Sequence, residues 1–335
     1  MLELVLRILV IKIEENRRKL ECMKYKFYVE GSPKVSVIGF GAWQLGNDID
    51  WHGMAEEEAI LLVHKAIEEG INFFDTAPNY GNGKSEVILG KALKEIKRDT
   101  VVINTKFGHH SDGQTNYRYN IIRETIEGSL KRLGTDYIDS VLLHNPPSKL
   151  LKAEGNEHYL VLEQLKKEGK ILAYGASLDT SADMDTFLNY TNGQVIEAFF
   201  NILHQDARYS FELALKKGVK IIAKIPLDSG WLSGKYHRDS TFTGVRARWS
   251  REDIITRAEL VEQLKELPAK GQSLSQFALQ YCLAYEAVST VIPGVADMEQ
   301  LLSNIGALDY PMDINTVKWL ESFYEQQVAK KHLVW

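Results

Sequence analysis

The stretch FFDTAPNYGNGKSE, residues 73–86, runs from a strand through a loop into a helix. Its apolar start predicts a buried strand that ends at Asp75, and Tyr80 follows five residues later in a loop of Pro, Asn and Gly. A helical pattern then begins near Ser85. Because buried strands seldom carry an unpaired carboxylate, an acid at a strand end with a phenol on the next loop indicates proton chemistry rather than packing.

The same strand-and-helix unit repeats along the chain from Val35 onward. The strand candidates are short, rich in Val, Ile and Phe, and apolar on both faces, which is typical of a parallel sheet covered by helices. They cover residues 35–41, 71–76, 101–106, 137–143, 171–176, 195–200, 219–225 and 288–292. Amphipathic helical stretches lie between them, at residues 56–70, 84–97, 121–134, 157–170, 210–218 and 273–285. This α/β pattern predicts a closed (β/α)8 TIM barrel.

Further segments are expected around the barrel. The sequence MKYKFYVEGSPKVSVIGFG, which begins at Met23, predicts an N-terminal hairpin that turns at residues 30–33. A long interruption at residues 228–272 contains a helical stretch at residues 255–267 and falls where barrel loops bind substrate or cofactor. Residues 313–331 predict an extra helix after the last unit.

Residues 1–22 are expected to form an accessory N-terminal extension, and residues 23–335 to form the barrel domain. The start of the chain, MLELVLRILVIKI, is apolar, but it is too short to span a bilayer and is interrupted by Glu3, Arg7 and Lys12. It also lacks the basic start and the small-residue cleavage site of a signal peptide. We therefore expect no membrane segment.

The overall composition excludes some classes of protein. The chain has 335 residues, of which 44% are hydrophobic and 25% are charged, as in an ordinary globular protein. A formal net charge of −5 gives no indication of a nucleic-acid partner, since such partners usually need a clustered basic face. Two cysteines cannot form a disulfide framework, so a cytoplasmic location is expected. Nothing in the sequence indicates the oligomeric state.

An open, doubly wound sheet is the alternative fold, and it would need a nucleotide-binding glycine motif. In GFGAWQLG, Gly39 and Gly41 have the spacing of a dinucleotide fingerprint, but Gly46 comes too late to be its third glycine. In GNGKS, Pro78 occupies the position where a phosphate-binding loop needs its first glycine. Both motifs are incomplete, which favours the barrel.

Four titratable residues fall at or just after the ends of consecutive strands. Asp75 ends the second strand, with Tyr80 just beyond it. Lys106 ends the third strand and His144 ends the fourth. Each residue alone has a plain structural explanation, such as a solvated rim charge or a loop cap. Because barrel strands present their carboxyl ends at one rim, we expect the four side chains to converge there.

This set of side chains is suited to protonating a carbonyl oxygen. A phenol has a pKa of about 10 and is a poor acid at neutral pH, whereas a neighbouring ammonium lowers that pKa. Lys106 is expected to act in this way on Tyr80, and Asp75 to keep Lys106 charged. His144 is expected to orient the carbonyl oxygen by a hydrogen bond or to relay the proton. No side chain supplies a hydride, so a nicotinamide cofactor is implied.

Metal-assisted hydrolysis is the competing chemistry for a barrel rim. Its ligands would come from His109, His110 and His144 together with carboxylates. Because His109 and His110 are adjacent in a loop, they are poorly placed to bind one ion together, and no metal is expected.

At this point the chain, from about Met23 to Ala307, resembles the aldo-keto reductase superfamily. The motifs that carry the resemblance are GFGAWQLG, INFFDTAPNYGNGKSE, INTKFG, SLKRLGTDYIDSVLLHNPP, ILAYGAS, PLDSGWLSGKY and VIPGVADMEQLLSN. The resemblance implies a (β/α)8 barrel that binds NAD(P)(H) at its rim and interconverts carbonyl compounds and alcohols. It also implies a catalytic tetrad composed of Asp75, Tyr80, Lys106 and His144.

Cofactor contacts are also implied by the resemblance. Ser177 matches the first residue of a Ser-Asn pair that holds the nicotinamide amide, but Leu178 replaces the Asn. Glu197 falls where the family usually has Gln, and Lys224 falls where many members have a Tyr that stacks on the nicotinamide. Further contacts near the catalytic residues are Gly41, Ala42, Trp43 and Asp75. The pyrophosphate and adenosine contacts are Pro226, Leu227, Ser229, Gly230, Leu232, Ser233, Gly234, Ile292, Pro293, Gly294, Gln300 and Asn304.

The adenosine segment departs from the pattern of members that prefer NADPH. VADMEQLLSN contains no Lys or Arg, and it contains Asp297 and Glu299. An acid near the ribose favours a free 2′-hydroxyl and repels a 2′-phosphate. The cofactor is therefore NADP or NAD, with NADH expected to be tolerated or preferred unless Lys224 or residues 246–248 supply the missing positive charge.

The substrate is expected to be a small carbonyl compound or alcohol. Tryptophans at the rim, namely Trp43, Trp51, Trp231 and Trp249, offer aromatic walls that suit sugars or aromatic aldehydes. Of these, Trp43 and Trp51 are expected to contact the substrate together with Tyr80 and His144. The alternative function is that of a catalytically slow, cofactor-sensing regulatory subunit, as in family members that modulate channels.

Overall fold

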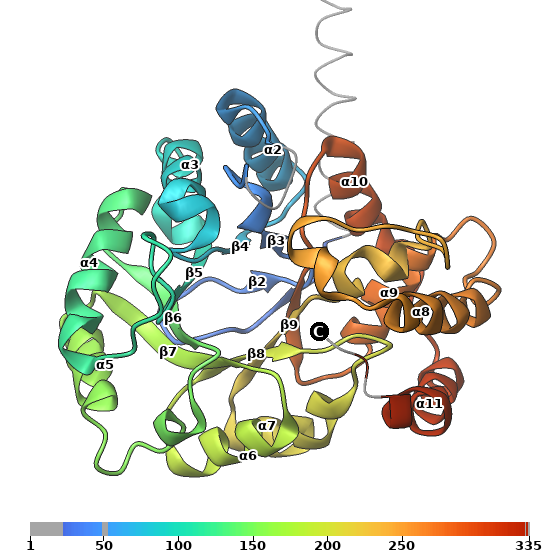
Figure 1. The fold of residues 1–335 in the computed structure, drawn as a ribbon. Coiled ribbons are helices and arrows are strands. Elements are labelled where there is room, and N and C mark those ends of the chain that lie inside the picture. The colour runs from blue at the N-terminus through green and yellow to red at the C-terminus, as the bar shows by residue number, and fades with distance from the viewer. Residues whose placement is uncertain (1–22, 49–52, 332, 334–335) are drawn as a thin grey trace, which may run out of the picture.

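The computed structural model contains one sheet of eight parallel strands, which follow one another around the sheet in chain order. Parallel bridges between Ile38 and Val291, and between Gly41 and Gly294, join the two edges, so the sheet closes into a barrel (Figure 1). The strands are β3 (Phe40–Gly41), β4 (Phe73–Asp75), β5 (Val102–Phe107), β6 (Ile138–His144), β7 (Ile171–Leu178), β8 (Val195–Phe199), β9 (Lys220–Lys224) and β10 (Val288–Ile292). The predicted (β/α)8 barrel is therefore confirmed.

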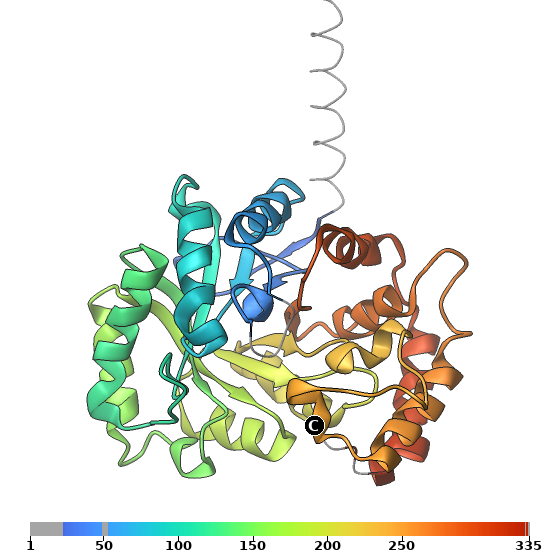
Figure 2. The same ribbon diagram turned by 45° about the horizontal axis from the view of Figure 1, so that its top comes forward.

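Helices surround the barrel on its outside (Figures 1 and 2). They are α2 (Glu56–Glu68), α3 (Lys84–Leu93), α4 (Ile122–Leu133), α5 (Glu157–Lys167), α6 (Ser181–Tyr190), α7 (Phe211–Lys217), α9 (Leu274–Leu283) and α10 (Met298–Gly306). The predicted helical stretches are all found. The helices α6 and α10 were absent from them. The sequence of α6, SADMDTFLNY, is short and weakly patterned, and the helix begins where the Thr180 side chain accepts a hydrogen bond from the Asp183 N–H.

The N-terminal hairpin closes one end of the barrel interior. Its strands, β1 (Tyr25–Lys26) and β2 (Val35–Ser36), are antiparallel, as predicted. Tyr28 from the hairpin packs edge-on against Phe73 inside the barrel, with 5.4 Å between ring centroids. The expectation of one strand over residues 35–41 is wrong, because its first residues pair with β1 whereas β3 pairs with β4.

Two further segments lie outside the repeated units. The long interruption after β9 contains the short helical turns η7 (Asp228–Ser233) and η8 (Gly244–Arg248) and the helix α8 (Arg251–Leu264). The helix α8 begins four residues before the predicted stretch because Ser250 and Asp253 form a capping box. The predicted terminal helix is α11 (Ile314–Phe323), which continues through further helical turns to residue 331.

The structure describes residues 23–48, 53–331 and 333. The predicted extension at residues 1–22 and the predicted substrate contact Trp51 lie outside these described residues. Among the helices in the described ranges, none is both long and apolar enough to cross a bilayer.

The glycine in β7 generates a prediction about stability. A Cβ added to Gly175 would lie 1.8 Å from the Val195 carbonyl oxygen of the neighbouring strand, so even alanine must push β7 and β8 apart. We expect Gly175→Ala to lower the free energy of unfolding by at least about 2 kcal/mol, measured by urea denaturation. The control is Gly128→Ala in α4, where the nearest atom is the flexible Arg132 guanidinium and the change should be neutral or slightly stabilising. Equal urea midpoints for the two variants would contradict this account.

Candidate active site

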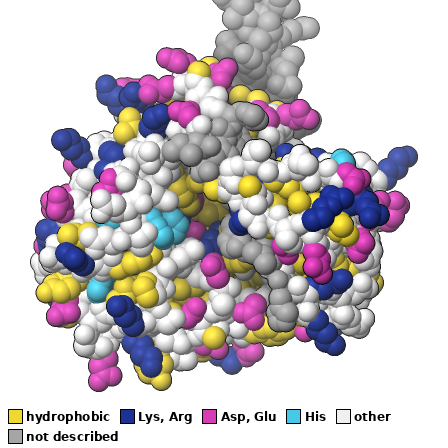
Figure 3. Space-filling model, in the orientation of Figure 1, with side chains coloured by type: hydrophobic (Ala, Val, Ile, Leu, Met, Phe, Trp, Pro, Cys, Tyr) yellow, Lys and Arg dark blue, Asp and Glu magenta, His cyan; other side chains and the backbone are white. Residues whose placement is uncertain are grey.

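The sequence-predicted tetrad converges at the carboxyl end of the barrel. Asp75 ends β4, Lys106 lies near the end of β5, and His144 ends β6. Tyr80 opens the turn η2 (Tyr80–Gly83), which directly follows β4. Figure 3 shows histidine side chains beside the hollowed centre of this face. The four side chains meet because parallel strands in register present their ends at the same rim.

A buried ion pair forms the centre of this site. The Lys106 ammonium lies 2.6 Å and 2.8 Å from the two carboxylate oxygens of Asp75 and also donates to the Thr76 carbonyl oxygen at 3.1 Å. The Tyr80 hydroxyl lies 3.4 Å from the same Lys106 Nζ. Lys106 and Asp75 are only 1% and 3% exposed, so their charges interact in a poorly screened environment. This is the predicted arrangement of acid, ammonium and phenol.

The protonation states of these groups follow from burial and charge. Burial alone would lower the pKa of Lys106, but the carboxylates of Asp75 and Glu197 outweigh it and raise that pKa, which keeps the ammonium charged. Burial raises the pKa of Tyr80 above that of a free phenol, and Lys106 offsets this only in part. The expectation of a net lowered Tyr80 pKa is therefore wrong. The lysine acts in the predicted direction, yet desolvation of the phenolate is the larger effect, so Tyr80 holds its proton at neutral pH.

His144 is a neutral neighbour of Tyr80. The two rings are nearly perpendicular, with centroids 6.1 Å apart. Burial, followed by the nearby cations Lys106 and Lys224, lowers the pKa of His144 well below its usual value. Its Nδ1 atom is buried and has no hydrogen-bond partner among the described residues. A neutral imidazole with an unused polar atom at the barrel mouth can hydrogen-bond to a small ligand.

His109 and His110, the other two histidines considered as metal ligands, contact neighbouring side chains and backbone atoms instead. His109 packs edge-on against His144, with 4.7 Å between ring centroids, and hydrogen-bonds to Tyr117. His110 hydrogen-bonds to the Asn116 carbonyl oxygen at 2.9 Å. In the part of the chain that the structure describes, no group of three His, Cys, Asp or Glu side chains is placed to hold a metal ion.

A second carboxylate and a carboxamide lie below the predicted tetrad. Glu197 Oε2 is 3.2 Å from Lys106 Nζ, so the lysine contacts two acids. Asn104 donates to Asp75 Oδ1 at 2.7 Å and lies 3.5 Å from Glu197. Asn104 in turn accepts a hydrogen bond from Ser140, whose hydroxyl contacts Tyr28 of the hairpin. Sequence analysis missed Asn104, although an Asn within the apolar run VVINTKF was a usable signal.

The polar network continues from Glu197 to the next two strands. Ser177 in β7 donates to Glu197 Oε1 at 3.1 Å and accepts from Lys224 Nζ of β9 at 2.9 Å. Lys224 also contacts Asn145 at 2.9 Å and Asp179 at 2.7 Å. These contacts place an acceptor, Glu197, and a donor, Lys224, on either side of one hydroxyl. A primary carboxamide, such as that of a nicotinamide, has both donor and acceptor atoms and matches this pair.

Backbone strain is concentrated on the loops that follow the site strands. All non-glycine residues with positive φ in the described ranges lie there, namely Asn82, Asn145, Ile225, Asp228 and Ser229. Each such conformation costs about 1–3 kcal/mol and persists only where surrounding contacts enforce it. Asp228 shows this directly, because its buried carboxylate pairs with Arg257 at 3.1 Å and lies 3.3 Å from His204.

Two arginines contact the loop around Ser229. Arg246 donates to the Ser229 carbonyl oxygen at 3.0 Å, and Arg248 lies 3.4 Å from its hydroxyl, so the arginine segment folds onto the loop predicted to bind pyrophosphate. The backbone N–H groups of Gly230, Leu232 and Gly234 already donate within the loop. Pro226 and Leu232 are buried, whereas Leu227 and Ser233 are partly exposed. At this loop, the two arginine side chains are therefore better candidates for contacting an anion than the backbone N–H groups.

The predicted adenosine residues lie where the barrel closes. Gly41 and Gly294 face each other closely, since a Cβ on Gly41 would meet the Pro293 carbonyl oxygen at 2.9 Å. Ala42 and Ile292 are buried beside them. Asp297 caps α10 by accepting from the N–H of Gln300, and it also accepts from the Gln300 side chain. Asn304 is buried, with its Nδ2 atom without a partner among the described residues, and Glu299 is exposed.

The tryptophans divide into two groups. Trp43 lies in the turn η1 (Ala42–Gln44), directly after β3, and is partly exposed. Trp231 and Trp249 are buried and pack against each other, with centroids 5.8 Å apart. The expectation that Trp231 lines the rim is wrong, because the loop around it folds over its ring. Trp249 packs within the same loop.

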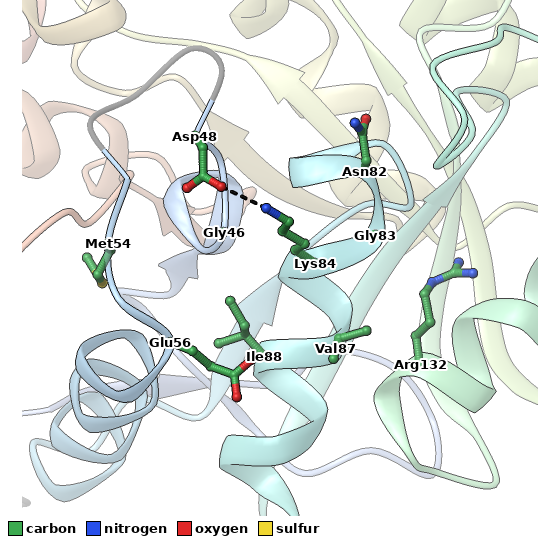
Figure 4. A pocket seen from close by; sticks show the side chains of 10 residues that line it. All are labelled: Gly46, Asp48, Met54, Glu56, Asn82, Gly83, Lys84, Val87, Ile88 and Arg132. Carbon is green, nitrogen blue, oxygen red and sulfur yellow. Dashed lines mark hydrogen bonds and ion pairs between the residues drawn. The ribbon is translucent and has the colours of Figure 1, made fainter.

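The turn carrying Tyr80 is also supported from outside the barrel. A surface pocket lies against it, lined by Asn82 and Gly83 of the turn itself and by residues of the η1 region, α2, α3 and α4 (Figure 4). There Lys84 at the start of α3 forms a 2.7 Å ion pair with Asp48. A Cβ on Gly81 would lie 2.5 Å from the Gly46 carbonyl oxygen, so only glycine permits this close approach. The pocket is separate from the tetrad.

Comparisons with known proteins agree with this geometry. The family model described as "Aldo/keto reductase family" matches residues 37–325. The chain is 32% identical over 297 residues to an NADH-specific methylglyoxal reductase of Escherichia coli, covering 82% of this chain and 90% of that protein. It is 30% identical over 316 residues to an L-galactose dehydrogenase of Arabidopsis thaliana, covering 90% and 93%.

A solved structure shares the same architecture. The aldo-keto reductase AKR11C1 of Bacillus halodurans, in its holo form, superposes with a TM-score of 0.75 at 28% identity, covering 91% of this chain and 99% of that one. The matched span includes every residue of the candidate tetrad. The chain therefore belongs to the aldo/keto reductase family of NAD(P)-dependent oxidoreductases.

Proposed function

We propose that this protein interconverts a small carbonyl compound and the corresponding alcohol, with Tyr80 as the proton donor and acceptor. The observation that carries the proposal is the buried series of contacts from Asp75 through Lys106 to the Tyr80 hydroxyl at the barrel mouth. A protonated phenol beside a permanently charged ammonium is suited to giving up its proton only when a neighbouring oxygen becomes negative.

A bound nicotinamide would supply the hydride that is added to the carbonyl carbon in reduction, and would accept the hydride removed from that carbon in oxidation. In carbonyl reduction, the Tyr80 proton passes to the carbonyl oxygen, and the phenolate that remains is stabilised by Lys106. Asp75 keeps Lys106 charged and fixed in position. The neutral His144 imidazole orients the substrate oxygen by a hydrogen bond. Alcohol oxidation runs through the same groups in reverse, with the alcohol proton returning to Tyr80.

The chain also has groups that match each part of a dinucleotide. Ser177, Glu197 and Lys224 offer the donor and acceptor set for the nicotinamide amide. The strained loop at residues 226–234 with its two arginines fits the pyrophosphate, and the segment from Ile292 to Asn304 fits the adenosine.

The cofactor proposed as preferred is NAD(H) rather than NADP(H). Asp297 and Glu299 add negative charge at the start of α10, where an adenosine 2′-phosphate would be repelled. The E. coli relative named as NADH-specific supports this assignment. Arg246 and Arg248 contact Ser229, which lies at the predicted pyrophosphate position instead.

The substrate class is set by what faces the barrel mouth. Trp43 lies directly after the strand β3, and its side chain is partly exposed. Its ring offers an apolar surface to a sugar or an aromatic aldehyde. Tyr80 and His144 would contact the reacting oxygen. Trp51 remains a predicted contact.

One prediction of the proposed function concerns the role of Tyr80. Replacing Tyr80 by Phe removes the transferable proton and leaves the ring, so kcat/KM for reduction of a generic aldehyde should fall at least about 100-fold. Tyr190→Phe, an exposed tyrosine on α6, is the control and should keep wild-type kinetics. Absent turnover in the wild type, with cofactor still bound, would favour the regulatory-subunit alternative. Equal turnover in wild type and Tyr80→Phe would exclude Tyr80 as the acid.

Another prediction of the proposed function concerns cofactor choice. The wild type should use NADH at least as efficiently as NADPH, and Glu299→Lys should raise the ratio of kcat/KM for NADPH over NADH about tenfold, because it replaces a repulsive charge by an attractive one. Glu124→Lys, an exposed acid on α4, gives the same change of net charge away from the site. A wild type far more efficient with NADPH would refute the NADH assignment.

A further inference from the structure

The candidate site contains more negative than positive charge. The single ammonium of Lys106 contacts both Asp75, at 2.6 Å, and Glu197, at 3.2 Å. All three side chains are at most 4% exposed. One cation is therefore shared by two buried carboxylates, and Glu197 is the additional one, because Asp75 alone would neutralise Lys106.

The neighbouring strands do not remove this excess. Lys224 of β9 reaches the network through Ser177, but its own charge is balanced by Asp179 at 2.7 Å. Four further titratable groups packed around the site, two tyrosines and two histidines, are uncharged at neutral pH. Burial, first of all, raises the pKa of Tyr28 and Tyr80, and it lowers the pKa of His109 and His144. With every acid and lysine ionised, three carboxylates face two ammonium groups.

The two redox states of a nicotinamide differ in charge. The oxidised ring carries one positive charge and the reduced ring carries none. A buried anion near the ring lowers the free energy of the oxidised form relative to the reduced form, and burial keeps salt from screening the effect.

We propose that Glu197 makes this protein bind the oxidised cofactor preferentially over the reduced one. The inference rests on the proposed function, because it requires the nicotinamide to bind beside this network. Glu197 acts here as a charge held next to Lys106 and Ser177, and it takes no part in the proton transfer from Tyr80.

The same charge makes the preference depend on pH. Burial, and then the charge of Glu197, raises the pKa of Asp75 to about 7. Below that pH the pair of carboxylates holds one proton and the network is neutral; above it, both are ionised and the excess charge is present. The preference for the oxidised cofactor should therefore grow as pH rises from 6 to 8.5. Without Glu197, the Asp75 carboxyl loses that repulsion, and the preference should be flat over this range.

The test is equilibrium binding of NAD⁺ and NADH by isothermal titration calorimetry, with no substrate present. At pH 8.5, Glu197→Gln should lower the ratio of the NADH Kd to the NAD⁺ Kd about fivefold or more, and it should abolish the pH dependence. Glu197→Asp keeps the charge and should keep most of the ratio. Glu212→Gln, an exposed acid on α7, removes one charge at the surface and should leave the ratio unchanged.

The outcomes separate this inference from the proposed function. A ratio in Glu197→Gln equal to that of the wild type would overturn the inference, while the loss of activity in Tyr80→Phe would still support the proposed chemistry. If Glu197→Gln fails to fold, the wild type alone decides, because a wild-type ratio that is independent of pH contradicts the inference. Failure of the wild type to bind either dinucleotide would overturn both.

Discussion

The position of one buried ammonium constrains the rest of this molecule. Taking the Lys106 charge out of water costs several kcal/mol, and the structure offsets that cost with a carboxylate on each of two other strands. Asp75 reaches it because β4 and β5 pair in register, with Asp75 opposite Asn104. A slip of one residue would turn Lys106 out of the barrel, since alternate side chains point to opposite faces. The chemistry of Tyr80 is therefore linked to the register of the sheet.

Local sequence predicted the parts of the site that depend on strand order alone. Asp75, Lys106 and His144 end consecutive strands, and the ends of parallel strands always meet at one rim. Glu197 could be placed on the rim in the same way, but not against Lys106, because β8 lies three strands from β5 and only closure of the barrel brings the two together. The prediction of a lowered Tyr80 pKa fails because burial of the phenol outweighs the effect of the nearby ammonium.

Other errors have the same origin in long-range contacts. Residues 35–41 have the composition of one strand, yet they divide because two different partners, β1 and β4, compete for them. The tryptophan pair Trp231 and Trp249 is suited to a substrate wall by composition, but the insertion after β9 is long enough to fold over its own aromatic rings. The buried ion pair between Arg257 and Asp228 anchors that insertion. The two residues are 29 positions apart, so no local sequence pattern predicts their pairing.

The raised pKa of Tyr80 affects carbonyl reduction and alcohol oxidation differently. A phenol that resists ionisation keeps its proton until an oxygen with developing negative charge is present. It is therefore in the protonated form that carbonyl reduction requires. Lys106 then stabilises the phenolate that forms. Glu197 opposes the phenolate electrostatically, because both are anions near the same ammonium, and it favours a positively charged nicotinamide. In alcohol oxidation the phenolate is protonated as the hydride leaves, which relieves that opposition. The state after reduction is also the state before oxidation, and in it the second carboxylate disfavours the phenolate but favours the oxidised nicotinamide.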